Sequence, residues 1–152
     1  MELLQINPES KPEEHGLPES SSAEQNFKMQ IEFYSKIGFH PPWVGYLAKA
    51  DGLPVGMGAF KGRPVNNKVE IAYFTFPEYE GKGIGTEICK GLVQTALAKD
   101  DKVEITARTL PEKNPSTRIL SRNGFVFSSA VQDPEDGEVW EWTFASDRQN
   151  KG

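Results

Sequence analysis

The chain has 152 residues, a usual length for one domain with one hydrophobic core. Hydrophobic residues make up 37% of it and aromatic residues 11%, which excludes a wholly disordered chain. A formal net charge of −5 argues against nucleic acid or an anionic membrane as the main partner, and it suits a cationic substrate.

The first part of the chain is polar and acidic, and three prolines interrupt it, Pro8, Pro12 and Pro18. We expect residues 1–24 to form a flexible or loosely docked arm and residues 25–152 to form a single domain. The start lacks the cationic region and apolar core of a secretory signal, and no run of about 18 apolar residues indicates a membrane span. A cytoplasmic protein that does not bind membranes is therefore expected.

Cysteine and histidine are scarce. Cys89 is the single cysteine, and the two histidines, His15 and His40, lie far apart among prolines and polar residues. An internal disulfide and a cysteine-built metal site are excluded, and no histidine-built zinc site is expected. Cys89 falls on the apolar side of a predicted helix, where packing is expected in place of nucleophilic chemistry.

The first half of the domain predicts a helix followed by strands. Residues 26–39 carry apolar side chains at helical spacing, and a pair of prolines ends this helix. Two strands joined by a tight turn at Asp51-Gly52 are expected within residues 43–62. Residues 66–76 predict a third strand, whose later half is apolar on both faces, as in the centre of a sheet.

The second half alternates helices and strands. Apolar residues take up a helical period from Gly83 on, which predicts a long amphipathic helix. A strand over residues 102–110 and a short helix over residues 116–122 follow, and this helix ends at Asn123-Gly124. Two last strands flank a turn at residues 133–137. This order predicts a mixed α+β fold in place of a regular βαβ alternation.

Three alternating glycines separate the third strand from the long helix, in the stretch EGKGIG at residues 80–85. The first N–H groups of a helix lack intrahelical partners and the helix dipole is positive there, so this loop can hold a phosphate or diphosphate. The phosphate-loop pattern and the pattern G-x-G-x-x-G of nucleotide-binding proteins are both out of register. A tight, closely packed turn is the alternative interpretation.

This loop and its helix resemble the acetyl-coenzyme A loop of the GNAT superfamily of N-acetyltransferases, whose pattern is [Q/R]-x-x-G-x-[G/A]. Gly83 and Gly85 match the glycine positions, whereas Glu80 stands where the family has glutamine or arginine. An acidic side chain at that place would repel a diphosphate unless it points to solvent.

Two further segments support the same resemblance, which covers about residues 25–145. The stretch VEIAYFTFPEY is similar to a strand of the branch that includes ribosomal-protein N-terminal acetyltransferases. The stretch TLPEKNPSTRILSRNGFVF resembles that branch's P-x-N-x-x-S-x-x-x-L-x-x-x-G-F segment. The residues in register are Pro111, Ser116, Leu120, Gly124 and Phe125.

The resemblance implies a GNAT-like fold, with a splayed, mostly antiparallel sheet of six to seven strands flanked by helices. Acetyl-coenzyme A would lie between two parallel central strands, here residues 68–76 and 102–110, with its diphosphate on the glycine loop. A backbone N–H near Phe74 would stabilise the oxyanion. The matching cofactor contacts are Phe74, Thr75, Phe76, Gly81, Lys82, Gly83, Ile84, Gly85, Thr86 and Asn114.

Direct transfer to an amine needs a base and a proton donor. Glu70, a carboxylate within an otherwise apolar strand, is the candidate base, and a solvated strand face is its alternative. Ser116 is the candidate donor to the departing thiolate, because Leu120 occupies the place where many members carry a tyrosine; a helix N-cap is the alternative role of Ser116. Tyr73 is a further option.

The sequence therefore predicts an acetyl-coenzyme A-dependent N-acetyltransferase that acts on a primary amine of a peptide N-terminus or a small molecule. A non-catalytic acyl-coenzyme A-binding module of the same fold and a nucleotide-binding protein are the alternatives. Residues 25–45 and the late strands are expected to form the acceptor pocket. Trp140 and Trp142 either line this pocket or pack in the core. No metal is predicted, and a homodimer is left open.

Overall fold

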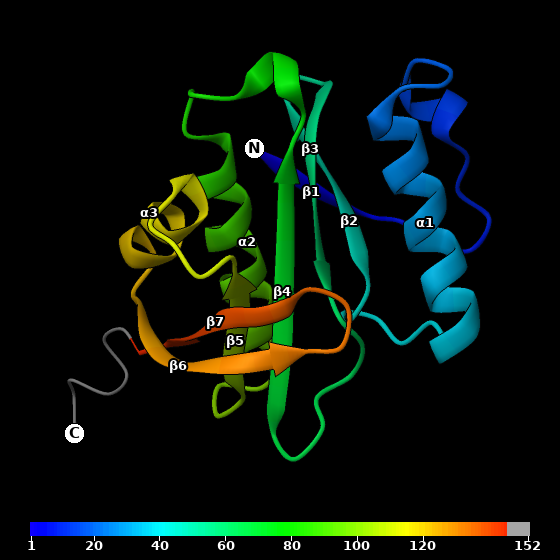
Figure 1. The fold of residues 1–152 in the computed structure, drawn as a ribbon. Coiled ribbons are helices and arrows are strands. Elements are labelled where there is room, and N and C mark those ends of the chain that lie inside the picture. The colour runs from blue at the N-terminus through cyan, green and yellow to red at the C-terminus, as the bar shows by residue number, and fades with distance from the viewer. Residues whose placement is uncertain (146–152) are drawn as a thin grey trace.

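One sheet of seven strands, in the order β1-β2-β3-β4-β5-β7-β6, organises the computed structural model, which describes residues 1–145 (Figure 1). Neighbouring strands run antiparallel except for β4 and β5, which are parallel. This confirms the mixed, mostly antiparallel sheet expected from the sequence. The strands are β1 (Glu2–Gln5), β2 (Gly45–Ala50), β3 (Leu53–Phe60), β4 (Lys68–Thr75), β5 (Glu104–Thr109), β6 (Phe125–Asp133) and β7 (Gly137–Phe144).

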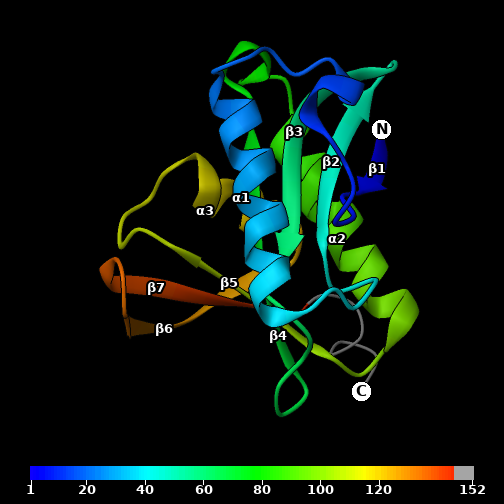
Figure 2. The same ribbon diagram turned by 90° about the vertical axis from the view of Figure 1, so that its right-hand side faces the viewer.

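Helices cover both faces of the sheet. Helix α1 (Ser22–Ile37) lies on one face, and helices α2 (Ile84–Lys99) and α3 (Pro115–Arg122) lie on the other (Figure 1, Figure 2). Helix α1 begins earlier than its apolar period predicts, because the Ser21 side chain accepts a hydrogen bond from the Glu24 N–H at 3.1 Å and caps the helix. Two short 3-10 helices, η1 (Pro12–His15) and η2 (Pro77–Tyr79), complete the elements.

The N-terminal segment is part of this fold. Strand β1 pairs with β2 along its whole length, from Glu2 opposite Lys49 to Gln5 opposite Tyr46. Ile6 is 3% exposed and packs in a core cluster beneath α1. The expected boundary between residues 24 and 25 falls inside α1, so the expectation of a loosely docked arm over residues 1–24 is wrong. The few apolar side chains of residues 1–24 pack against a sheet edge and a core, and composition alone does not reveal this packing.

Helix α2 packs closely on the centre of the sheet. A Cβ atom at Gly58 would lie 2.8 Å from Ile88 Cγ2 and 2.9 Å from Leu92 Cδ1, so β3 has no room for a side chain there. Ile88, Leu92 and Ile71 are all fully buried in the resulting core. This packing holds the start of α2 against the end of β4, where the glycine loop connects them.

The two parallel strands pair over a short length only. Their register runs from Lys68 opposite Glu104 to Ile71 opposite Ala107, although β4 continues to Thr75 and β5 to Thr109. Strands β6 and β7 lie at a steep angle to β4 (Figure 1). The sheet is therefore splayed between β4 and β5, as expected, and the gap opens toward the glycine loop.

Substituting Ile6→Ala tests the docking of the N-terminal segment. We expect a loss of about 2–4 kcal/mol in the free energy of unfolding, because a buried aliphatic side chain leaves a cavity. Urea unfolding measures it, with exposed Glu9→Ala as the control. A loss as small as that of the control would mean that the segment does not pack in solution.

Candidate active site

A cleft of about 610 Å³ opens where β4 and β5 separate. The end of β4, the glycine loop, the first turn of α2 and one side of α3 form its walls. Its volume lies within the range typical of small-molecule and cofactor sites. The lining residues are Tyr73, Phe74, Thr75, Tyr79, Glu80, Gly81, Gly83, Ile84, Gly85, Thr86, Pro115, Ser116, Arg118, Ile119 and Arg122.

The backbone of β4 offers hydrogen-bonding groups to this cleft. The carbonyl of Glu70 accepts from the Lys61 N–H, and the Phe76 N–H donates to the Val55 carbonyl, both at 2.9 Å. The backbone N–H and C=O groups of even-numbered residues in β4 therefore point toward β3, and this includes the N–H of Phe74. The backbone N–H groups of Tyr73 and Thr75 point toward the gap, so these two residues replace Phe74 as the candidate oxyanion donors.

The glycines of the loop have different structural roles. Gly81 and Gly83 have φ angles of 78° and 80°, in the left-handed region that favours glycine, and a Cβ atom at either would meet nothing within 4 Å. Gly83 is the N-cap of α2 and offers no side-chain cap, which leaves the first N–H groups of the helix available for an anion. Gly85 is a packing position instead, because its Cβ would lie 2.6 Å from Ile119 Cδ1.

Positive charge reaches the cleft from α3. Arg118 and Arg122 are exposed, line the cleft and stand one turn apart on the same side of the helix. We did not predict them from the sequence, although their spacing of four residues was a usable signal. The predicted Lys82 does not line the cleft, and its Nζ lies 5.7 Å from the centre of the Tyr79 ring. Exposed Glu80 lies at the cleft edge.

Ser116 lies at the junction of two cavities. It lines the large cleft and also a second cavity of about 290 Å³, which includes Asn114. The N-cap of α3 is Asn114, whose side chain accepts from the Thr117 N–H at 3.0 Å, so a capping role for Ser116 is excluded. The Tyr73 hydroxyl donates to the Ser116 carbonyl at 3.1 Å and ties β4 to α3.

The Tyr73 hydroxyl is buried and keeps its proton at neutral pH. Burial raises the pKa of its hydroxyl, and the nearby Cys89 adds to this effect. Its proton is also engaged in the hydrogen bond to the Ser116 carbonyl, so Tyr73 has the role of positioning α3. Ser116 stays the candidate donor because it lines both cavities, whereas Tyr73 lines only the cleft.

Glu70 lies in a cluster of charges on the opposite face of the sheet from α2. Its carboxylate is 3.0 Å from Lys61 Nζ and 3.8 Å from Arg108 Nε. Arg108 also contacts Asp133, with 3.1 Å between Nη1 and Oδ2, and Glu141, with 3.4 Å between Nε and Oε2. The apolar surroundings assumed for Glu70 are therefore wrong, because its neighbours in space come from other strands. Glu70 is not among the described residues that line the three cavities.

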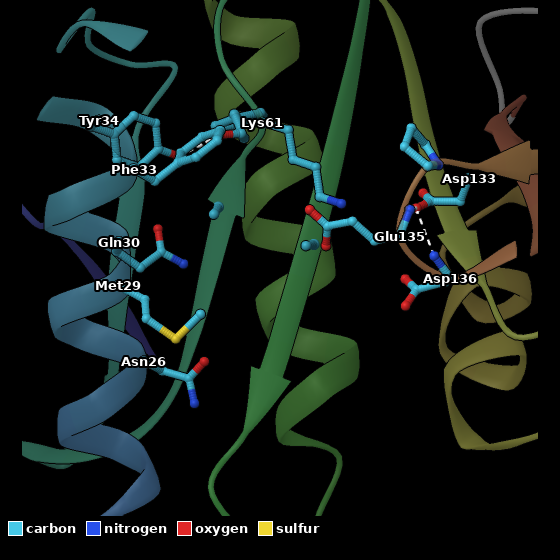
Figure 3. Close-up of a pocket in the computed structure, with 13 residues that line it drawn as sticks. Asn26, Met29, Gln30, Phe33, Tyr34, Lys61, Asp133, Glu135 and Asp136 are labelled. Atoms are coloured by element: carbon cyan, nitrogen blue, oxygen red, sulfur yellow. Dashed lines mark hydrogen bonds between the residues drawn. The ribbon is translucent and has the colours of Figure 1, made fainter. Parts of the chain in front are cut away.

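A third cavity, of about 450 Å³, lies between α1 and the β6–β7 hairpin (Figure 3). Lys61, Asp133 and Asp136 line both this cavity and the second one. The expectation that residues 25–45 and the late strands form a pocket agrees with this position. Its lining residues are Asn26, Met29, Gln30, Phe33, Tyr34, Ala59, Phe60, Lys61, Ala72, Asp133, Pro134, Glu135 and Asp136.

Other predicted residues have structural roles. Phe76 is 3% exposed and packs in the core beneath α1. Trp142 is buried, and its Nε1 donates to Thr109 Oγ1 at 3.1 Å, while Trp140 packs against Phe127. Both tryptophans thus belong to packing and not to a cleft. Over residues 1–145, no group of metal-ligating side chains is present and no helix is long and apolar enough to cross a membrane.

The chain belongs to the GNAT acetyltransferase family, since the family model described as Acetyltransferase (GNAT) domain matches residues 3–126. It is 31% identical to "Putative ribosomal N-acetyltransferase YdaF" of Bacillus subtilis (strain 168). That match covers 61% of this chain and 56% of the relative, so the chain spans little more than half the length of this relative.

Solved structures share the fold. A ribosomal-protein alpha-N-acetyltransferase, RimL, in complex with coenzyme A has a TM-score of 0.67 and 14% identity, over 93% of this chain and 91% of that chain. A chimera of spermidine N-acetyltransferase SpeG from Vibrio cholerae and hSSAT has a TM-score of 0.72 and 13% identity, over 100% of both chains. The aminoglycoside acetyltransferase AAC(6')-Ib in complex with coenzyme A has a TM-score of 0.60 and 21% identity, over 71% of this chain and 69% of that chain. These matches confirm the predicted GNAT-like fold.

Cys89 is expected to be inert in the folded protein. It is fully buried on α2, and burial raises the pKa of its thiol to about 12, so the reactive thiolate is scarce near pH 8. A thiol reagent should label the single cysteine only after unfolding, as followed by absorbance with and without denaturant. Fast labelling of the native protein would contradict this packing role.

Proposed function

We propose that the protein is an acetyl-coenzyme A-dependent N-acetyltransferase that transfers the acetyl group directly to a primary amine. The observation that carries this proposal is the cleft between β4 and β5, which has a helix start suited to an anion at one side and shares Ser116 with a second cavity lined by charges of both signs. Family membership and similarity to structures whose names give N-acetyltransferases support it.

The cleft has the groups that acetyl-coenzyme A needs. The N–H groups from Gly81 to Gly85 and the start of α2 bind the diphosphate. Arg118 and Arg122 supply the positive charge that Glu80 does not. The pantetheine arm lies along the gap-facing groups of Tyr73 and Thr75, as an added strand would.

The reaction forms a bond between the amine nitrogen and the acetyl carbon and breaks the bond between that carbon and sulfur. The gap-facing N–H groups of β4 stabilise the charge that develops on the carbonyl oxygen. Ser116 donates a hydrogen bond or a proton to the departing thiolate, because it lines both the cofactor cleft and the second cavity. Glu70 lines no cavity itself but contacts Lys61, which lines the second one, and it is the candidate base acting through water.

A non-catalytic acyl-coenzyme A-binding module is the second candidate. It rests on Leu120, which is fully buried where many family members carry a tyrosine, and on Glu80 at the cleft edge. Turnover with any amine separates the two candidates. A cytoplasmic location, a homodimer and the absence of a nucleic-acid partner stay predictions.

Acetyl-coenzyme A is expected to raise the melting temperature, because a ligand that binds only the folded state stabilises it. Arg118→Ala and Arg122→Ala should each weaken its affinity by about two- to tenfold, through loss of a charge-assisted contact. Arg63→Ala, which removes an exposed arginine of the β3–β4 connection, is the matched control. No stabilisation by acetyl-coenzyme A, or a shift with ATP alone, would overturn the proposed function.

Ser116→Ala is expected to lower kcat by about tenfold or more while acetyl-coenzyme A affinity stays the same, since proton transfer contributes to the chemical step. Glu70→Gln should lower kcat/KM and remove the loss of activity at low pH if Glu70 is the base. Glu104→Gln, at the outer edge of the same charge cluster, is the control. A slower Glu70→Gln enzyme with the wild-type pH profile would make Glu70 a positioning residue.

A further inference from the structure

We propose that the acceptor is a primary amine that carries a second positive charge, separated from the reacting nitrogen by an aliphatic chain. This inference rests on the proposed function and names the substrate class of the same site. The reacting amine lies in the second cavity, next to Ser116, and the rest of the acceptor lies in the third cavity, between α1 and the β6–β7 hairpin.

The three cavities adjoin one another, and we place the cofactor and the acceptor along this path. Ser116 lines both the cofactor cleft and the second cavity, and Lys61, Asp133 and Asp136 line both the second cavity and the third. An acceptor that lies in the second and third cavities with its amine at Ser116 therefore has its body next to the hairpin turn.

The charged residues on this path differ in how far they are neutralised. Asp133 contacts Arg108 and accepts hydrogen bonds from the N–H groups of Glu135 and Asp136, at 2.9 and 3.2 Å. It therefore stabilises the turn. Lys61 is neutralised by Glu70 at 3.0 Å.

The side chains of Glu135 and Asp136, by contrast, make no ion pair with another described residue, and both line the third cavity. Both extend from the hairpin on the side facing α1 (Figure 3). The charge left uncompensated over this cavity is negative, and it selects a cation.

The opposite wall, on α1, has exposed apolar side chains beside the amides of Asn26 and Gln30, which is an independent observation from the acidic turn (Figure 3). Met29 is 64% exposed and Phe33 is 41% exposed on α1, and both line the same cavity (Figure 3). Large apolar side chains in a cavity fit the methylene groups of an acceptor, and the Phe33 ring can also contact a cation. The apolar side chains of α1 and the acidic turn together match an aliphatic chain with a cationic end.

Two kinds of acceptor have this chemistry, a small diamine and a peptide with a lysine next to its N-terminal residue, and the first experiment distinguishes them. One arm measures kcat/KM for linear diamines of increasing length against monoamines of the same length. The other arm compares peptides whose first residue is followed by lysine with the same peptides carrying glutamine. We expect a preference of about tenfold for the dicationic member in one arm. Equal kcat/KM for monocationic and dicationic members in both arms would overturn the inference.

Variants of the turn test the residues. Glu135→Gln and Asp136→Asn should each raise KM for the dicationic acceptor by about two- to fivefold and raise the KM of the monoamine by a smaller factor. Glu138→Gln, on the same hairpin but outside the cavity lining, is the matched control for the change in charge. Unchanged KM in the double variant would overturn the assignment, and the comparison of acceptors on the unmodified protein does not depend on the folding of any variant.

Failure of this inference and failure of the proposed function give different results. If acetyl-coenzyme A does not raise the melting temperature of the unmodified protein, the proposed function is overturned. Retained acetyl-coenzyme A binding and acetylation of amines, with no preference for the second charge, overturns the acceptor class alone.

Discussion

The separation of β4 from β5 is the constraint on which the rest of the site depends. Pairing ends at Ile71 and Ala107, and beyond it the backbone of β4 has unpaired groups on one side. The glycine loop and the start of α2 close one end of the gap, and α3 closes the other, tied to β4 through Tyr73 and Ser116. Since backbone groups in a gap must find partners, a ligand that pairs like a strand is the natural occupant.

Charge is divided between the two sides of this gap. The side of the cleft has a helix start and two arginines on α3, whereas the side of the hairpin has carboxylates on the hairpin, β4 and β7 that surround Lys61 and Arg108. Arg108 connects the side of the hairpin, because Glu70, Asp133 and Glu141 all contact it from different strands. The formal net charge of −5 shows that acidic residues are in excess, but it does not show where in the structure they lie.

Much of the fold could be predicted from local patterns. The turn at Asp51-Gly52 has positive φ at both residues, as the dipeptide predicts, and Gly124 ends α3 with a φ of 84°. The glycine loop was predicted as an anion site because its chemistry lies in consecutive residues. Residues 1–24 were misjudged, because a polar segment with few apolar side chains becomes ordered only when a sheet edge and a core accept them.

By itself, the sequence determined the order of helices and strands, the glycine loop before α2 and the motif residues that indicate the family, since period, turn chemistry and motifs are local properties. Only the tertiary structure decided what surrounds each side chain. Arg118 and Arg122 became cleft residues through the packing of α3, and Glu70 acquired Lys61 and Arg108 as partners across strands. Contacts between residues far apart in the chain depend on strand order and splay, which no local pattern encodes.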